Sequence, residues 1–241
     1  ISIYDGSNLE EDDSIINCDN TNHSCVNVSN SLLDLSGTSV NCSNINVCIN
    51  AYGSKIRFNE VSVTTTSVQY NAINISDVSK ASIYDSTIST DGTTSGINLK
   101  VNSILNANDS SITTNDGTGM YVNNGGYFRG DNVNITRSNN TPTVDMGTFS
   151  IFKLGGANSS IADIHCYDTN VKVDIYDEVT SAVNKNSSCD GNQNSNVNGG
   201  AETVFYLTNS IFRSDIGGRS GADMKCLNHL DNDTIILMNN S

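Results

Sequence analysis

The chain has 241 residues, of which 36% are hydrophobic, and its 26 acidic and 12 basic side chains give a formal net charge of −14. Such a surface repels nucleic acid and anionic lipid, because both bind through clustered lysine and arginine. No stretch approaches the roughly 20 consecutive apolar residues of a transmembrane helix. Asn, Ser, Thr and Asp are abundant, as in disordered chains, but the apolar residues alternate with polar ones inside short segments. This regular alternation favours strands over disorder.

One pattern of three short alternating segments, separated by turn residues, repeats along the chain. The apolar residues that open one of the segments recur at steps of 23, 25, 24, 23 and 24, and they are Leu33, Ile56, Ala81, Leu105, Phe128 and Phe152. A second segment recurs in the same register, with first residues Val26, Ile49, Ile73, Ile97, Met120 and Val144. A fixed period of this length indicates a solenoid. The sequence therefore predicts an all-β fold, a right-handed parallel β-helix with three strands per coil of about 23–25 residues.

The period extends over most of the chain and shows no domain boundary. We expect a single β-helical domain over 1–241, with an irregular loop region at about 166–204. Within it, the Asn-, Ser- and Gly-rich run 184–200 is typical of a surface loop. The regular pattern returns at 205–207 and fades after 235–237.

The seven cysteines follow the coil alignment. Cys18 and Cys42 end one predicted strand, as does Cys166, whereas Cys25 and Cys48 begin the next. Disulfides Cys18–Cys25 and Cys42–Cys48 would each cross one turn of one coil. Zinc is the competing interpretation, but the chain has no C-x-x-C pair, and spacings of six or seven residues suit a loop staple better.

The remaining cysteines are assigned by exclusion. Cys166–Cys189 would close the irregular loop, and Cys226 would be a free thiol, because its expected partner position is Ser214. We predict no metal site. Disulfides indicate an oxidising compartment, so the chain is expected to be exported to the cell surface or the extracellular space.

Two columns of polar residues are predicted on the outer surface, because strand side chains alternate between faces. The first column reads Asn17, Asn41, Thr64, Ser89, Thr113, Thr136 and then His165. The second column reads Asn27, Asn50, Asn74 and Asn98. Either column is ordinary solvated strand surface or a polar ladder that hydrogen-bonds another molecule. Apart from His165, these are the candidate binding residues.

Catalysis has less support than binding. A polysaccharide hydrolase needs two or three converging carboxylates, and a lyase needs calcium-binding acids with a basic residue. The acids include the run Glu10 to Asp13 and Asp85, Asp109, Asp116, Asp131 and Asp145. Most of them are predicted in turns, where Asp serves the backbone conformation. Arg57, Arg129 and Lys153 share one outward column, but no acidic cluster shares their coils on it. We expect no enzyme and no cofactor.

The coil pattern, the Asn/Ser/Thr/Gly-rich turns, the acidic balance and the short-loop cysteines resemble the passenger domains of Gram-negative autotransporters, most nearly the self-associating adhesins. The resemblance covers roughly 1–156 and 205–241, and the seven cysteines depart from it, because most passengers carry few. It implies export through the periplasm and display by a C-terminal membrane barrel outside this sequence. No functional residue is carried over from that family.

These observations predict an adhesin that acts through its polar ladders. Its partner would be a like molecule on a neighbouring cell or a host glycan or protein, and not nucleic acid. Two alternatives stay open: a polysaccharide-binding or -cleaving β-helix, such as a lyase or phage-spike fragment, and a structural stalk that binds nothing.

Overall fold

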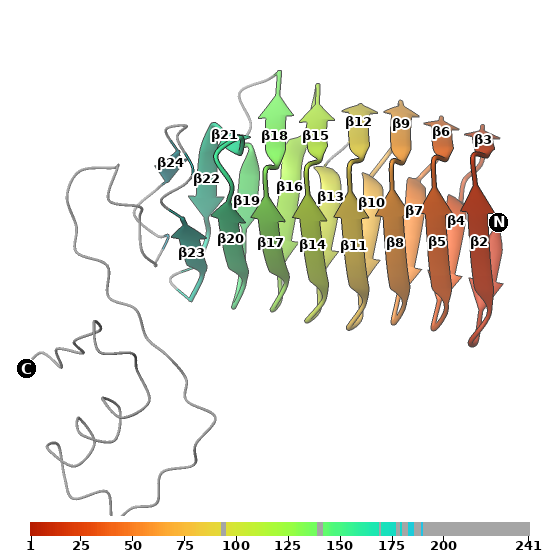
Figure 1. The fold of residues 1–241 in the computed structure, drawn as a ribbon, viewed down its shortest axis with the longest axis horizontal. Helices are drawn as coiled ribbons and strands as arrows, with labels where there is room; N and C mark the ends of the chain where they lie inside the picture. Colours follow the sequence, from red (N-terminus) through yellow and green to blue (C-terminus); the bar gives the residue numbers. More distant parts are fainter. Residues whose placement is uncertain are drawn as a thin grey trace, which may run out of the picture. The chain divides into compact units, whose positions relative to one another are not determined.

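The computed structural model describes residues 1–92, 95–138, 142–168, 170–176, 179, 183–185 and 189. These residues form strands and turns and contain no helix, so no helix among them could cross a membrane. The strands pair in parallel in three sheets that wind into a solenoid with one strand per sheet in each coil (Figure 1). The predicted all-β solenoid with three strands per coil is confirmed.

Sheet A lies at the back of the view in Figure 1, sheet B at the front and sheet C along the upper edge. The strands of sheet A are β1 (Ser2–Tyr4), β4 (Ser24–Ser29), β7 (Val47–Tyr52), β10 (Asn71–Ser76), β13 (Ser95–Lys100), β16 (Thr118–Asn123), β19 (Val144–Met146), β22 (Asp163–Cys166) and β24 (Asn184–Lys185). The strands of sheet B are β2 (Asn8–Asp12), β5 (Leu32–Ser36), β8 (Lys55–Asn59), β11 (Lys80–Tyr84), β14 (Ile104–Asn108), β17 (Tyr127–Asp131), β20 (Ile151–Gly155) and β23 (Lys172–Ile175). The strands of sheet C are β3 (Ile15–Asp19), β6 (Ser39–Ser43), β9 (Ser62–Thr66), β12 (Thr87–Asp91), β15 (Ser111–Thr114), β18 (Asn134–Arg137) and β21 (Ser160–Ile161).

The pairing register is the one that the sequence period predicts. Leu33 pairs with Ile56 in sheet B, and Ile73 pairs with both Ile49 and Ile97 in sheet A. The inward side chains of all three sheets form one continuous, almost completely buried core. In its later coils, the rings of Phe128 and Phe152 stack with centroids 4.6 Å apart. Parallel pairing keeps equivalent residues in contact from coil to coil, so a thin core needs few apolar residues.

The turn between sheets B and C explains part of the Asp, Asn and Gly content. One residue per coil there has a positive φ: Asp13, Gly37, Glu60, Asp85, Asp109, Asn132 and Gly156. Left-handed backbone favours Gly, Asn and Asp, which lose less than other residues in that conformation. Asp85 and Asp109 therefore serve the turn, as the sequence predicts.

Buried serines join the turns of successive coils. In the turn from sheet A to sheet B, the backbone N–H groups of Ser31, Ser54 and Ser79 donate to the Oγ of Ser54, Ser79 and Ser103, respectively, at 3.0–3.2 Å. Each hydroxyl satisfies a backbone donor that no strand partner reaches. Much of the serine in the chain is therefore structural.

The coil shortens after β19. Ile164 pairs with Val144, only 20 residues earlier, and Val173 pairs with Phe152, 21 residues earlier. Strands β23 and β24 lie within 166–204, the region expected to be irregular, and continue sheets B and A. The pattern predicted at 205–237, the free thiol predicted at Cys226 and nearly all of the 184–200 loop lie outside the described residues.

Candidate functional site

The Asn column of sheet A forms a continuous amide ladder. The Nδ2 of Asn98 donates to Asn74 Oδ1 at 3.0 Å, Asn74 donates to Asn50 at 2.8 Å, and Asn50 donates to Asn27 at 3.0 Å. Asn27 in turn donates to the Tyr4 hydroxyl at 3.3 Å. Each amide donates to the residue one strand nearer β1. The amide oxygen that receives no bond from the ladder is therefore that of Asn98, on β13.

This ladder is buried although it lies on the outward side of sheet A. Asn74 is 4% exposed and Asn98 is 9% exposed, whereas Asn27 and Asn50 are half-buried. The ladder therefore lies at the bottom of a depression, and of the two alternatives for this column, ordinary solvated strand surface does not hold for Asn74 and Asn98.

The depression is a groove along sheet A. One hollow of about 500 Å³ is lined by Asn50, Asn74 and Asn98 on strands β7, β10 and β13, and it continues to Tyr121 and Asp145 on β16 and β19. A second hollow of about 430 Å³ adjoins it toward β1 and shares Val47, Asn50 and Tyr70 with the first. Seven strands spaced by about 4.8 Å give the two hollows a combined length of about 29 Å.

Tyrosines give the groove apolar surface beside its polar base. Tyr4 on β1 and Tyr52 on β7 line the part nearer β1, and Tyr70, directly before β10, and Tyr121 on β16 line it farther along. Tyr4, Tyr52 and Tyr70 are exposed large side chains. The groove therefore offers amides and hydroxyls together with aromatic rings.

Asp145 closes one end of the groove. Its column continues the amide ladder, because Asn98 pairs with Tyr121 and Tyr121 pairs with Asp145 in the strand register. Asp145 is 9% exposed, and its Oδ2 accepts a 3.1 Å hydrogen bond from Thr118 Oγ1. Burial raises the pKa of this carboxyl above its ordinary value, although the hydrogen bond from Thr118 opposes the rise. The groove thus ends in a carboxyl group whose charged form is disfavoured by burial.

His165 and Tyr167 lie on the far side of that carboxylate. His165 Nδ1 is 3.5 Å from Asp145 Oδ1, which is ion-pair distance for a protonated imidazole, and the Tyr167 hydroxyl also interacts with this carboxyl. The ring of Tyr167 meets that of His165 edge to face, with centroids 4.4 Å apart. Burial and the charge of Asp145 raise the pKa of Tyr167. Asn98 Oδ1, which receives no bond from the ladder, is enclosed without a donor.

A salt bridge fixes the neighbouring turn. Arg137 Nη2 is 2.9 Å from Asp163 Oδ2, and the backbone N–H of Thr143 donates to Asp163 Oδ1 at 2.7 Å. Burial alone would raise the pKa of Asp163, but these hydrogen bonds and the Arg137 charge lower it overall.

The predicted column of sheet C is assembled as expected up to Thr136. Asn17, Asn41, Thr64, Ser89, Thr113 and Thr136 are aligned by the strand register. Asn41 Nδ2 donates to Asn17 Oδ1 at 2.9 Å, and the Thr113 and Thr136 hydroxyls are 3.1 Å apart. All except the half-buried Thr113 are exposed, so this column lies on an open face and not in a groove.

The placement of His165 in that column is wrong. His165 lies in sheet A beside Asp145, because β21 already occupies the next place in sheet C and β22 begins only two residues later. Cys166 consequently does not share the coil position of Cys18 and Cys42. A constant period of 23–25 residues places His165 in sheet C, but the coil that ends at β22 has only 20 residues between Val144 and its partner Ile164.

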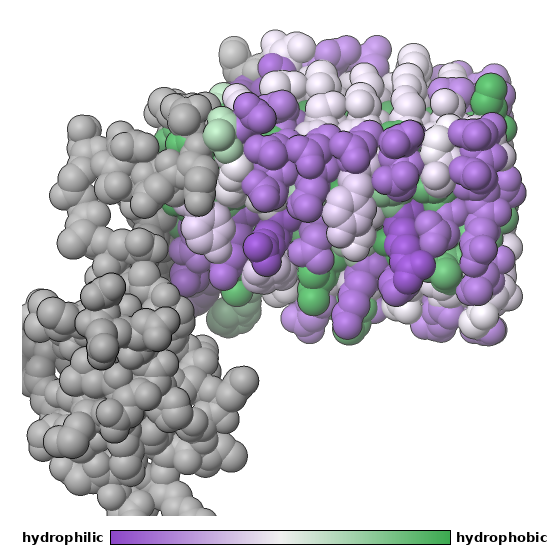
Figure 2. Space-filling view, in the orientation of Figure 1, coloured by the Kyte–Doolittle hydropathy of each residue, from purple (hydrophilic) through white to green (hydrophobic). Residues whose placement is uncertain are grey.

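The basic column lies on sheet B and is flanked by acids. Arg57 is 3.1 Å from Asp34, and Lys153 is 3.9 Å from Asp174. The acid of each pair lies in the coil next to that of its base, and not in the same coil. Figure 2 shows the largely hydrophilic face over sheet B. Arg57 and Lys153 are thus paired with acids, whereas Arg129 lines a hollow of about 570 Å³ together with Asp131 and Tyr176.

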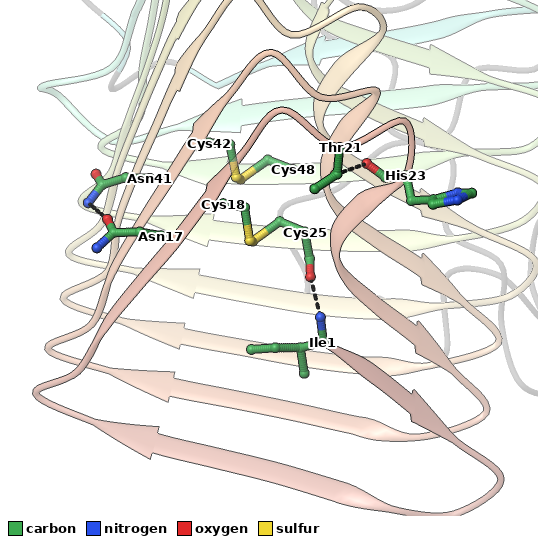
Figure 3. The surroundings of a disulfide bond; sticks show 9 residues. All are labelled: Ile1, Asn17, Cys18, Thr21, His23, Cys25, Asn41, Cys42 and Cys48. Carbon is green, nitrogen blue, oxygen red and sulfur yellow. Dashed lines mark hydrogen bonds between the residues drawn. A yellow bond between two sulfur atoms is a disulfide. The ribbon is translucent and has the colours of Figure 1, made fainter.

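Three disulfides lie among the described residues, and they join the expected pairs Cys18–Cys25, Cys42–Cys48 and Cys166–Cys189. The first two link β3 to β4 and β6 to β7 across the turn between sheets C and A. Figure 3 shows them one above the other, with Asn17 and Asn41 pointing away from them on the outside of the same strands. They stiffen the coils on which both polar columns begin.

No family model, curated protein or solved structure matches this chain. Within the described part of the chain, no group of three or more His, Cys, Asp or Glu side chains is placed to hold a metal ion. The groove residues that the sequence prediction missed include Tyr4, Tyr52, Tyr70, Lys100, Thr118, Tyr121 and Asp145. Tyr121 and Asp145 could have been found, since they continue the Asn column in the same register.

Proposed function

We propose that this chain is an extracellular adhesin that binds an extended glycan in the groove of sheet A. The observation that carries the proposal is the groove itself, in which a column of amides lies beside tyrosine rings over several coils. Ligand sites are concave and combine apolar walls with a few placed polar groups. Three disulfides are compatible with an exported protein.

The chemistry of the groove suits sugars. Each ladder amide uses one N–H for its neighbour, so a second N–H of each amide lies outside the ladder for a hydroxyl acceptor. Tyrosine rings supply flat apolar surface for the faces of pyranose rings. The strands repeat every ~4.8 Å, a distance similar to the advance of an extended pyranose chain per ring. Many weak contacts would add along such a chain.

Binding is favoured over cleavage because the described groove residues include one carboxylate, Asp145, whereas glycoside hydrolysis needs a pair. Display on a cell surface, by a barrel-anchored export route like that of autotransporter passengers, is part of the proposal. The structural-stalk alternative would leave the groove without a role.

A glycan array with matched tyrosine variants tests the proposal. Tyr70 lies in the groove and is 49% exposed, whereas Tyr84 lies on sheet B and is 42% exposed. Tyr70→Ala should weaken binding of the glycan selected on the array by roughly tenfold, the effect of losing one aromatic contact. Tyr84→Ala should bind like the wild type. Absence of any bound glycan, or equal losses in the two variants, would refute the proposal.

A second candidate is self-association through sheet C. Its uncharged Asn, Ser and Thr column spans six neighbouring strands and is exposed except at Thr113. A face of this kind fits another flat face better than a single polymer chain.

A further inference from the structure

One hollow on sheet B exists because a side chain is missing from an outward column. The column runs over β11, β14, β17 and β20 and past the end of β23, and it reads Tyr84, Asn108, Asp131, Gly155 and Tyr176. Gly155 leaves a gap between Asp131 and Tyr176, which are two strand spacings or about 10 Å apart. The gap opens into the hollow of about 570 Å³ that Arg129 also lines, a volume in the usual range of small-ligand sites. The strands concerned lie side by side at the front of Figure 1.

Tyr176 supplies an aromatic side to this gap. A Cβ at Gly155 would lie 3.3 Å from Tyr176 Cδ2, so the ring stands directly beside the glycine backbone. The Tyr176 side chain is 41% exposed, which leaves ring surface for a ligand. Aromatic rings present a large, flat apolar surface, which suits the C–H face of a sugar ring. The gap can therefore hold one sugar ring against Tyr176.

Arg129 and Asp131 place opposite charges in the lining of the hollow. Both point outward from β17 and are exposed. Neither side chain forms an ion pair or a hydrogen bond within the described part of the chain. A guanidinium binds a carboxylate through two parallel N–H groups, and an aspartate accepts hydrogen bonds from hydroxyls. A carboxylate and neighbouring hydroxyls are the groups that a uronic acid carries on its ring.

We propose that this hollow binds a uronic acid unit, with its carboxylate on Arg129, its hydroxyls on Asp131 and one ring face on Tyr176. The proposal goes beyond the glycan groove, because it adds a second site on another face of the solenoid. The hollow and the groove share no lining residue among those described, so each can be tested alone.

The local charge favours an acidic ligand, although the formal net charge of the chain is −14. Strands β17, β20 and β23 carry three bases and two acids, which are Arg129, Lys153, Lys172, Asp131 and Asp174. Asp174 is shared by two of the bases, at 3.9 Å from Lys153 and 3.3 Å from Lys172. Arg129 pairs with Lys153 in the strand register, so two positive charges stand on neighbouring strands. Repulsion from distant acids is screened beyond about 8 Å at physiological salt.

Ligand-observed NMR with three matched small probes tests the proposal. Methyl glucuronide carries both the ring and the carboxylate, methyl glucoside lacks the carboxylate, and acetate lacks the ring. At about 0.15 M salt, where distant charges are screened, the wild type should bind methyl glucuronide more tightly than either of the others. The expected difference is roughly tenfold or more, about the value of one charged hydrogen bond.

Two variants and a control locate the binding. Arg129→Gln should weaken binding of methyl glucuronide roughly tenfold, because it removes the partner of the carboxylate. Gly155→Asn should abolish binding, because Asn108 shows that the column accepts this residue and its side chain would fill the gap. Lys55→Gln removes the same charge from an exposed position of sheet B outside the hollow, and it should bind like the wild type.

Equal binding of methyl glucuronide and either other probe would overturn the proposal. An unchanged affinity in Arg129→Gln, or an equal loss in Lys55→Gln, would do the same. Arg129 is an exposed side chain, so its variant decides the question even if Gly155→Asn fails to fold. Tyr70→Ala should leave binding of methyl glucuronide unchanged, so failure of this site and failure of the groove are separate outcomes.

Discussion

At the scale of single residues, position on the coil decides what an acidic side chain does. Asp85 and Asp109 adopt the left-handed backbone of a turn, whereas Asp145 lies in a strand and is buried at the end of a groove. The sequence predicts Asp85 and Asp109 in turns, whereas the recurring strand triplet Val144–Met146 predicts Asp145 as the outward residue of a strand, and the structure has it there. Its neighbours Val144 and Met146 are both buried, so the middle residue of the triplet has to point outward. Residue type alone did not separate the two roles.

Asp145→Asn should stabilise the protein near neutral pH. The pKa of Asp145 is raised in the folded state, so folding favours the protonated carboxyl. That contribution is fully present below the ordinary Asp pKa and is lost as the pH rises through the raised folded pKa. The ionisable groups that face Asp145 are Tyr121, His165 and Tyr167, with Lys100 in the same hollow.

Urea unfolding of wild type and variant at about pH 3 and about pH 7 checks this prediction. The two proteins should be similar at the lower pH, and the variant should be more stable at the higher pH. The opposing effect of Asp163, whose pKa is lowered, is common to both proteins and cancels in the comparison. A variant less stable than wild type near pH 7 would contradict the prediction.

At the scale of elements, the two polar columns predicted from the same rule have different environments. The sheet C column is exposed, whereas the sheet A column is enclosed in its middle and bonded from strand to strand. Alternation along a strand predicts which side chains point outward, but not what stands beside them. The groove walls include Tyr52 and Lys100 at the ends of strands and Tyr70 in a turn, and their approach to the ladder depends on the path of the turns.

Asn74→Asp should therefore be costly, while Thr64→Ala should not. Asn74 donates to Asn50 and accepts from Asn98, so an aspartate places a buried charge against the oxygen of Asn50. We expect a loss of at least about 2 kcal/mol in the free energy of unfolding near neutral pH. Thr64 is exposed, and its truncation should change that free energy by less than about 0.5 kcal/mol. Equal effects in urea titrations would mean that the ladder does not stabilise the fold.

At the scale of the whole molecule, the described coils present three outer faces with different chemistry. Sheet A carries the groove, sheet B carries paired charges, and sheet C carries an uncharged polar column. A solenoid permits this division because each sheet takes one strand from every coil. Glycan binding and self-association can therefore be separated by substitutions on different faces.

Thr64→Glu with Ser89→Glu should suppress self-association through sheet C. Like charges at these neighbouring exposed positions would repel a second copy of the face. The control is Asn59→Glu with Tyr84→Glu, which adds the same charge on neighbouring exposed positions of sheet B. Sedimentation and a cell-clumping assay should show loss of association only in the sheet C variant. Unchanged clumping in that variant would remove sheet C from the proposed function.

The sequence by itself determined the architecture: the three strands per coil, their register from 1 to about 156, the core positions and the cysteine pairs. It could do so because parallel stacking repeats the same local contacts, so period and alternation carry the tertiary information. Only the tertiary structure decided that the Asn ladder lies in a groove, that Asp145 closes it and that His165 belongs to sheet A. These features depend on where turns bring side chains and on a change of coil length, and neither is encoded in a fixed period.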